Sequence, residues 1–465
     1  MGRVSGAAAA RVIGEFAEEL DVAALPEPVV HAAQSLILDA VGTAVAASRE
    51  DFAVRAERAL TALAGDAPGD ATVVGRSTRL PLRDAVTLNG VLVHGLDFDD
   101  THPPAVLHPT ASALPAVLGL AERHGLTGGD ILLGYVLAVE VTTRLGAAAS
   151  GAFHLRGFHP TGVLGVFGAA VAAARLTGLS AQGIATAQGV AGSLASGLLE
   201  FIGDGAWTKR LHPGWAAASG ITAAALAAED FVAPDEIYEG RYGLYASFLG
   251  TDHGAALKAR LDTLGTVWET RAVAVKPYPA CHFVHAFVDA AIALAERHDL
   301  DPERIEQIHC LIAEEEIPSV FEPLPVKRRP RSAYEAQFSV PHAVASALTR
   351  RRFTRDELTP AVRGDPVVRE LARRTTYGPD PDSLFPRAFS GEVRIRLDDG
   401  SLVTHREQVN RGALERPLSP AEIRAKFDAN IAGVLSPDGA DELARLVAAL
   451  PELDDPAPLF AALAP

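Results

Sequence analysis

Cysteine and aromatic residues are scarce in this chain, and both shortages narrow the kind of protein that it encodes. Only two cysteines, Cys281 and Cys310, occur among 465 residues, too few for a disulfide framework or a cysteine-based zinc site. Aromatic residues make up 6% of the chain, although 48% of the residues are hydrophobic. We therefore expect a globular protein of a reducing compartment, with a large core built mainly from small aliphatic side chains.

Positive charge is also in short supply, since the formal net charge is −16 at pH 7. Nucleic acids and anionic membranes attract cationic surfaces, so neither is an expected partner. The most apolar stretch, residues 161–179, is interrupted by Arg175 and suits a buried helix better than a membrane span. Arg11 interrupts the apolar run at the N-terminus, and acidic residues follow at once, which is a poor match to a signal peptide. These features predict a cytoplasmic protein.

The first part of the chain, residues 1–265, has the periodicity of successive helices rich in glycine and alanine. Residues 114–124 and 130–149 are apolar at helical spacing, and Ser180 is placed to cap a further helix. Another alanine-rich helix is expected over residues 214–230. We predict one large all-helical domain here, in which small side chains let the helices approach closely.

The sequence pattern changes over residues 266–410, where segments with strand periodicity alternate with segments with helix periodicity. Residues 272–276 and 304–313 alternate like strands, and residues 392–409 read as a hairpin with an Asp-Gly turn. We predict a smaller α/β (α+β) domain in this part of a mainly α protein. Residues 411–465 return to helix and are expected to return to the helical domain.

The densest polar cluster covers residues 94–102 and continues to His108. It holds Asp97, Asp99, Asp100, Thr101 and several histidines in an otherwise apolar context. A structural explanation is that Asp100 and Thr101 cap a following turn and that Asp99 is solvated. The Asp and His side chains also suit a divalent metal ion. An acid–base site is the third interpretation, because carboxylates and imidazoles close together have perturbed pKa values.

Two further clusters place imidazoles and ammonium groups next to helix N-termini. His159 precedes the helix signal of Pro160 and Thr161, and Lys209 and His212 precede the helix expected from Gly214. A helix N-terminus attracts anions, which favours an anion-binding function. Solvated loop residues would give the same pattern, so each cluster alone is a weak signal.

The last cluster, residues 276–285, begins with a lysine at the end of a strand-like segment. A buried ammonium there requires an anionic partner or a tuned pKa, which makes Lys276 a candidate site residue. His282 and His285 follow at the start of a helix and are candidates for substrate binding. Cys281 is better explained as a small buried residue than as a nucleophile.

Taken together, the four clusters supply cations and proton carriers to an otherwise acidic protein. That combination suits a di- or tricarboxylate substrate and proton transfer at a carbon next to a carboxylate. The sequence contains no phosphate loop, no dinucleotide-binding glycine pattern after a strand, no HExxH and no GxSxG context. We therefore expect no cofactor.

Seven segments in this order resemble the MmgE/PrpD family, across roughly residues 10–450. They are NGVLVHGLDFDDTH, HPTASALPAVLGLAE, GYVLAVEVTTRLG, GFHPTGVLGVFGAAVAAARLTGLS, KRLHPGWAAASG, KPYPACHFVH and FSVPHAVASAL. The family includes 2-methylcitrate dehydratases, cis-aconitate decarboxylases and iminodisuccinate epimerases. The resemblance implies a helical domain, a smaller lid domain, a homodimer, a site in the cleft between the domains, and acid–base catalysis without a metal.

The resemblance also implies roles for individual residues. His108 and His159 become the candidate proton carriers, and Lys209 and Lys276 would hold substrate carboxylates and stabilise enolate-like charge. Asp97 would orient a histidine or a lysine. Thr101 would donate a hydrogen bond, and His212, His282 and His285 would contact substrate.

The chain departs from the family's pattern at several places. The first cluster of the 2-methylcitrate dehydratases resembles DFNDT, so Asp99 stands here at the position of their asparagine. Their next segment resembles HPSDN, whereas in this chain Thr110-Ala111 follows His108-Pro109. Cys281 lies in a loop where decarboxylase-type members carry a histidine. A lyase is therefore the main hypothesis. An epimerase of an amino- or iminodicarboxylate, a metal-dependent hydrolase built on the Asp/His cluster, and a scaffold without activity are the alternatives.

Overall fold

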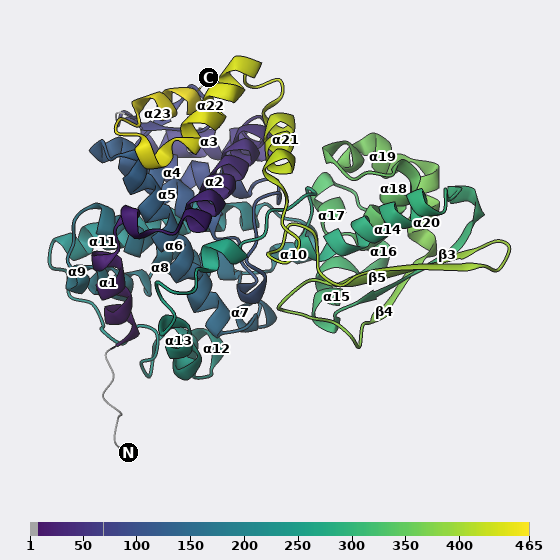
Figure 1. Ribbon diagram of the computed structural model, residues 1–465, viewed down its shortest axis with the longest axis horizontal. Helices are drawn as coiled ribbons and strands as arrows, with labels where there is room; N and C mark the ends of the chain where they lie inside the picture. Colours follow the sequence, from purple (N-terminus) through teal and green to yellow (C-terminus); the bar gives the residue numbers. More distant parts are fainter. Residues whose placement is uncertain (1–7, 68, 465) are drawn as a thin grey trace.

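The fold is mainly α with a smaller α/β part, as the sequence predicts. The computed structural model describes residues 8–67 and 69–464. A large helical body and a smaller body built on a sheet lie side by side, and the C-terminal helices return to the helical body (Figure 1). Two main hydrophobic cores correspond to this division. One extends from Ala10 to Val275 and resumes at Leu418, and the other covers residues between Tyr278 and Leu397 together with Val106.

The helical body is built from thirteen helices and one short hairpin in the described N-terminal part of the chain. These elements are α1 (Ala9–Glu19), α2 (Glu27–Ala47), α3 (Asp51–Ala64), β1 (Ala71–Thr72), β2 (Arg79–Leu80), α4 (Leu82–His94), α5 (Thr110–His124), α6 (Gly128–Ala148), α7 (Ala152–Leu155), α8 (Pro160–Leu176), α9 (Ala181–Ala191), α10 (Phe201–Asp204), α11 (Thr208–Ala228), α12 (Leu244–Leu249) and α13 (Gly254–Leu261). The C-terminal helices that join them are α21 (Pro420–Ile431), α22 (Pro437–Ala448) and α23 (Ala457–Leu463).

Small residues explain how the central helices pack so closely. A Cβ added to Gly90 of α4 would collide with Gly214 of α11, and one added to Gly220 of α11 would collide with Ala169 of α8. Glycine at these crossings lets α11 lie directly against both neighbours. As a result, the C-terminal end of α4 and the N-terminal ends of α8 and α11 meet in one region.

In the described part of the chain, two helices, α2 and α6, are long and apolar enough to cross a membrane by length and composition. The apolar window of α6 is 100% buried inside the fold, and that of α2 is 67% buried. Both therefore have the burial of core helices.

The second body contains a four-stranded sheet in the order β4 (Thr375–Pro379), β3 (Ile305–Ile312), β5 (Gly391–Leu397), β6 (Leu402–Glu407). β3 pairs parallel with β4 and antiparallel with β5, and β5 and β6 form the predicted hairpin. Helices α14 and α20 contact the sheet, and α18 packs against both helices. The helices of this body are α14 (His285–Arg297), α15 (Ile317–Val320), α16 (Leu324–Lys327), α17 (Ala333–Gln337), α18 (Val340–Arg350), α19 (Pro360–Gly364) and α20 (Pro366–Arg374).

Two local predictions differ from the structure in ways that affect the site. Residues 272–276 form no strand; only Ala274 makes an isolated bridge, with Thr101. The segment connects the two bodies, so it finds one backbone partner instead of a sheet edge. Helix α11 begins at Thr208, six residues before the predicted start, with Pro213 inside it. Packing against α4 and α8 maintains the helix across this proline, and Lys209 consequently lies in its first turn.

Candidate active site

A cavity lies where the two bodies meet. The helical body and the connecting segment contribute the carboxylate and both lysines of its lining together with apolar groups such as Leu199 and Phe201, and the second body contributes mostly apolar groups. The lining residues are Asp97, Thr101, Val106, His108, His154, His159, Leu199, Phe201, Ile202, Lys209, Lys276, Cys281, His282, Phe283, Ser319, Phe338 and Phe389.

Asp97 is the electrostatic centre of this cavity. Its Oδ1 accepts hydrogen bonds from Lys209 Nζ at 2.7 Å and from Lys276 Nζ at 2.9 Å. Burial alone would raise the pKa of Asp97, but the two ammonium groups outweigh it and hold that pKa well below its usual range. The carboxylate is therefore ionised at neutral pH, and two cations share one anion.

Lys276 is a fully buried lysine in the segment that connects the two bodies. Burial would lower its pKa, yet the Asp97 carboxylate raises it, so the group stays an ammonium. Its Nζ also donates to the backbone carbonyl of Asp97 at 2.8 Å. An isolated ammonium in this position would be costly, so Lys276 and Asp97 stabilise each other.

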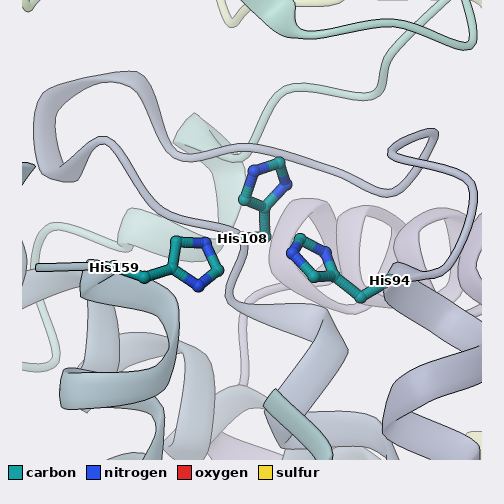
Figure 2. A group of neighbouring side chains, drawn as sticks. All are labelled: His94, His108 and His159. Atoms are coloured by element: carbon teal, nitrogen blue, oxygen red, sulfur yellow. The ribbon is translucent and has the colours of Figure 1, made fainter. Parts of the chain in front are cut away.

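Three histidines, His94, His108 and His159, face one another beside this ion cluster (Figure 2). They come from three helix ends: His94 is the last residue of α4, His108 shortly precedes α5, and His159 is the N-cap of α8. The ring of His94 stacks on that of His159, with centroids 5.5 Å apart. The close packing of the central helices thus brings together imidazoles that are up to 65 positions apart in the chain.

Each of these imidazoles is oriented through its Nδ1. His94 Nδ1 lies 2.7 Å from Asp99 Oδ2, and His108 Nδ1 lies 2.7 Å from the carbonyl oxygen of Asp100. His159 Nδ1 lies 3.0 Å from the Nδ1 of His212, so one of these rings donates to the other. A fixed Nδ1 contact orients the ring and leaves its Nε2 available for chemistry.

Burial lowers the pKa of His108 and of His159 well below the usual range. The ammonium groups of Lys276 and Lys209 add to this effect at His108, and His94 and His212 add to it at His159. Both imidazoles are therefore neutral at neutral pH before substrate arrives. A neutral imidazole is ready to accept a proton.

All six predicted catalytic residues line the cavity. Of the three predicted substrate-binding residues, one lines it and two do not. His282 lines the cavity, and Asn410 Nδ2 lies 2.7 Å from its Nε2. His212 does not line it and meets the site through His159. His285 also lies outside the lining, because its Nε2 is directed at the carbonyl oxygen of Ala280 at 3.1 Å.

Sequence reasoning missed the aromatic wall of the cavity and one histidine. Phe283 and Phe389, whose ring centroids lie 4.9 Å apart, come from the second body and are joined there by Phe338. Phe283 lies within the predicted cluster of residues 276–285, but its side chain type, like that of Phe338 and Phe389, is the same as that of an ordinary core phenylalanine. His154, on α7, carried a signal that was available: it lies five residues before His159 in the same polar segment.

Among the residues that the structure describes, two groups of side chains have ligand atoms close enough for a divalent ion. They are His94, His108 and His159, and Asp97, Asp99 and His108, with ligand atoms within 4.8 Å of one another. Both groups share His108, whose pKa is lowered by burial and further by the nearby ammonium groups of Lys276 and Lys209. The same ammonium groups oppose a cation at Asp97, so the second group suits a metal poorly.

Comparison with known proteins agrees with this architecture. The sequence model of the MmgE/PrpD N-terminal domain matches residues 11–255, and that of the MmgE/PrpD C-terminal domain matches residues 278–452. A cis-aconitate decarboxylase of Homo sapiens is 30% identical over 450 residues, which cover 94% of this chain and 90% of the relative.

Two other relatives bear the same name. The cis-aconitate decarboxylase of Mus musculus is 32% identical over 403 residues, which cover 83% of this chain and 79% of the relative. That of Aspergillus terreus is 27% identical, with 96% of this chain and 94% of the relative covered. With both domain models matched in order over most of its length, this chain belongs to the MmgE/PrpD family.

Proposed function

We propose that this protein is a lyase that decarboxylates cis-aconitate, or a closely similar small polycarboxylate, by acid–base chemistry of histidine and lysine. The observation that carries the proposal is the pair of ammonium groups on Asp97 in a buried cavity that His108 and His159 also line. The cis-aconitate decarboxylases among the relatives support the same reaction.

Substrate binding follows from the charges in the cavity. Lys209 and Lys276 share the Asp97 carboxylate, and both line the cavity, so their ammonium groups can also donate to substrate carboxylates. Thr101 Oγ1 and Asp97 Oδ2 are buried and have no hydrogen-bond partner among the described residues. The Thr101 hydroxyl is thus free to donate to a carboxylate.

In the chemical step the substrate loses one carboxylate as CO₂. The bond between the methylene carbon and its carboxylate breaks and releases CO₂. Its electron pair forms a new double bond between the methylene carbon and the central carbon, and the electron pair of the original double bond moves onto the far carbon. Negative charge then develops on the carbon α to a remaining carboxylate, where the two ammonium groups stabilise it. Protonation of that carbon completes a dicarboxylate with a terminal methylene group.

The proton comes from an imidazole that substrate binding charges. His108 and His159 are neutral in the free protein, but substrate carboxylates beside them favour the protonated form and raise their pKa. A protonated imidazole within reach of the α-carbon then acts as general acid. Catalysis in this scheme needs no metal, and the aromatic wall excludes the water that would otherwise protonate the carbanion without control.

The test is incubation of the purified protein with cis-aconitate, 2-methylcitrate and iminodisuccinate, followed by NMR and by measurement of released CO₂. We expect CO₂ from cis-aconitate alone and an unchanged rate after treatment with a chelator. Dehydration of 2-methylcitrate or epimerisation of iminodisuccinate would replace the proposed reaction. Loss of activity with the chelator would favour the metal-dependent alternative, and turnover of none of the three acids would contradict the proposal.

A further inference from the structure

The turn that carries Asp97 is held by its backbone in an unusual way. Four consecutive carbonyl oxygens, those of residues 95–98, each accept a hydrogen bond from a different side chain. The pairs are Arg210 Nε to Gly95 at 2.8 Å, Gln337 Nε2 to Leu96, Lys276 Nζ to Asp97 at 2.8 Å and Lys426 Nζ to Phe98 at 2.7 Å. All four carbonyls are therefore satisfied by side chains from outside the turn.

These side chains come from every part of the fold that surrounds the site. Arg210 lies on α11 of the helical body, and Lys276 lies in the connecting segment. Gln337 is the last residue of α17 in the second body, and Lys426 lies on the C-terminal helix α21. The turn is thus the point where four segments far apart in sequence are joined by hydrogen bonds.

The conformation of the turn needs such support. Asp97 has φ of 50°, in the left-handed region that costs an L-residue energy. A residue held there persists only when its surroundings determine its backbone more strongly than its own preference does. The side-chain donors to the carbonyls of Leu96 and Phe98 hold the backbone on either side of Asp97 in this conformation.

Gln337 connects this turn to the second body. Its side-chain amide donates to the carbonyl of Leu96 and, at 3.1 Å, to that of Pro279. Its own carbonyl accepts from the backbone N–H of Cys281 at 2.9 Å. One residue of the second body therefore ties the Asp97 turn to the segment that follows Lys276.

Lys426 makes the corresponding connection from α21, the first of the three C-terminal helices. Its Nζ lies 2.7 Å from Asp39 Oδ1 on α2 and 3.8 Å from the centroid of the Phe98 ring, in addition to its bond to the Phe98 carbonyl. The side chain is 7% exposed, and Asp39 is 1% exposed. Asp39 pairs with the charge of Lys426. The hydrogen bond from Lys426 to the Phe98 carbonyl is therefore the contact by which this side chain reaches the site.

We propose that Gln337 and Lys426 are positioning residues, which hold the peptide groups on either side of Asp97 so that its carboxylate meets Lys209 and Lys276 together. Neither side chain lines the cavity, so each acts through Asp97 and not on substrate. The inference rests on the proposed function for its kinetic readout, but its structural readout is independent of any reaction.

The first test is Gln337→Met, which removes both donors at similar length. Displacement of a catalytic constellation by about 1 Å costs roughly 10²-fold in rate, so kcat should fall by about that factor while KM changes by less than about threefold. Gln188→Met is the matched control. Gln188 is also buried and donates to two carbonyls, those of Ala10 at 2.9 Å and Ile184 at 3.0 Å, away from the site.

The second test compares Lys426→Met with Asp39→Asn. Both disturb the same buried ion pair, but only the first removes the donor to Phe98. We expect Lys426→Met to lower kcat about tenfold or more, Lys426→Arg to recover part of the loss, and Asp39→Asn to change kcat by less than about threefold. Equal losses in Lys426→Met and Asp39→Asn would assign Lys426 to stability alone and overturn its positioning role.

Hydrogen exchange provides the readout that needs no substrate. The amides of Asp97 and Thr101 donate to the carbonyls of His94 and Ala274, and they should exchange faster in Gln337→Met and Lys426→Met than in Gln188→Met. Unchanged exchange at both amides and unchanged kcat in folded variants would overturn the proposal. If the wild-type protein turns over no acid, the proposed function fails, and exchange at these two amides still decides the positioning inference.

Discussion

The two walls of the cavity differ in chemistry. The helical body and the connecting segment provide the carboxylate, the two ammonium groups and most of the imidazoles, whereas the second body provides three phenylalanines beside Cys281, His282 and Ser319. The charged residues of the first wall lie mostly at helix ends whose packing is fixed by glycine contacts. The aromatic residues of the second wall lie in loops and short helices around the sheet. We infer that the first wall performs the chemistry and the second excludes water and shapes the cavity.

The largest expected effect is at the ion cluster of the charged wall. Lys276→Met should lower kcat/KM by about 10³-fold, because it removes both a substrate contact and charge stabilisation in the transition state. Lys258→Met, at an exposed lysine paired with Asp262, should leave the rate unchanged. Steady-state kinetics on cis-aconitate measure both. A loss of less than about tenfold in Lys276→Met would contradict the assignment of the chemistry to this wall.

The next effect concerns the proton carriers. His159→Ala should lower kcat by about 10²-fold or more, the scale of lost general acid–base catalysis. His342→Ala provides the control, because His342 is also a buried histidine but lies in the second body, with its Nε2 2.9 Å from the carbonyl of Glu357. If both variants have similar kcat, then His159 is a structural residue and the comparison of the two walls loses one of its main supports.

A smaller effect is expected at the aromatic wall. Phe283→Leu should raise KM by about tenfold or less and leave kcat within about threefold, because it changes apolar contact and no reacting group. Phe287→Leu is the control, since Phe287 is fully buried and packs against Phe321 away from the cavity. A large drop in kcat for Phe283→Leu would show that this wall takes part in the chemical step.

The smallest effect concerns stability, and it lies behind the charged wall. Burial raises the pKa of Asp100 to about 8, so the folded protein holds this group protonated at neutral pH while the unfolded chain ionises it. The free energy of unfolding contributed by this group therefore falls as pH rises from about 4 to about 8.

Asp100→Asn should remove that dependence. Its Tm should exceed that of the wild type near pH 8 and approach it near pH 4, whereas Asp235→Asn at an exposed site should change neither value. Thermal unfolding across this pH range is the measurement. A variant that is less stable than the wild type at pH 8 would show that Asp100 carries its charge in the fold.

Much of the site was predictable because its polar residues are unusual in their context. His159 before a helix, Lys276 beside a strand-like run and the carboxylates from Asp97 onward all stand out in an apolar sequence. The aromatic wall could not be predicted, because Phe283 and Phe389 differ from core residues only by their position. The role of Gln337 was equally hidden, since its partners, the carbonyls of Leu96 and Pro279, are 241 and 58 positions away.

The sequence by itself determined the mainly α fold through helix periodicity, which is a local property, and the family through its motifs. The polar clusters and the family resemblance together predicted the six polar residues that line the cavity. Only the tertiary structure decided that one oxygen of Asp97 joins Lys209 and Lys276, and that His212 lies behind His159 instead of in the cavity. Those relations depend on how closely α4, α8 and α11 pack and where the second body rests. They are set by contacts between segments that no local pattern in the chain encodes.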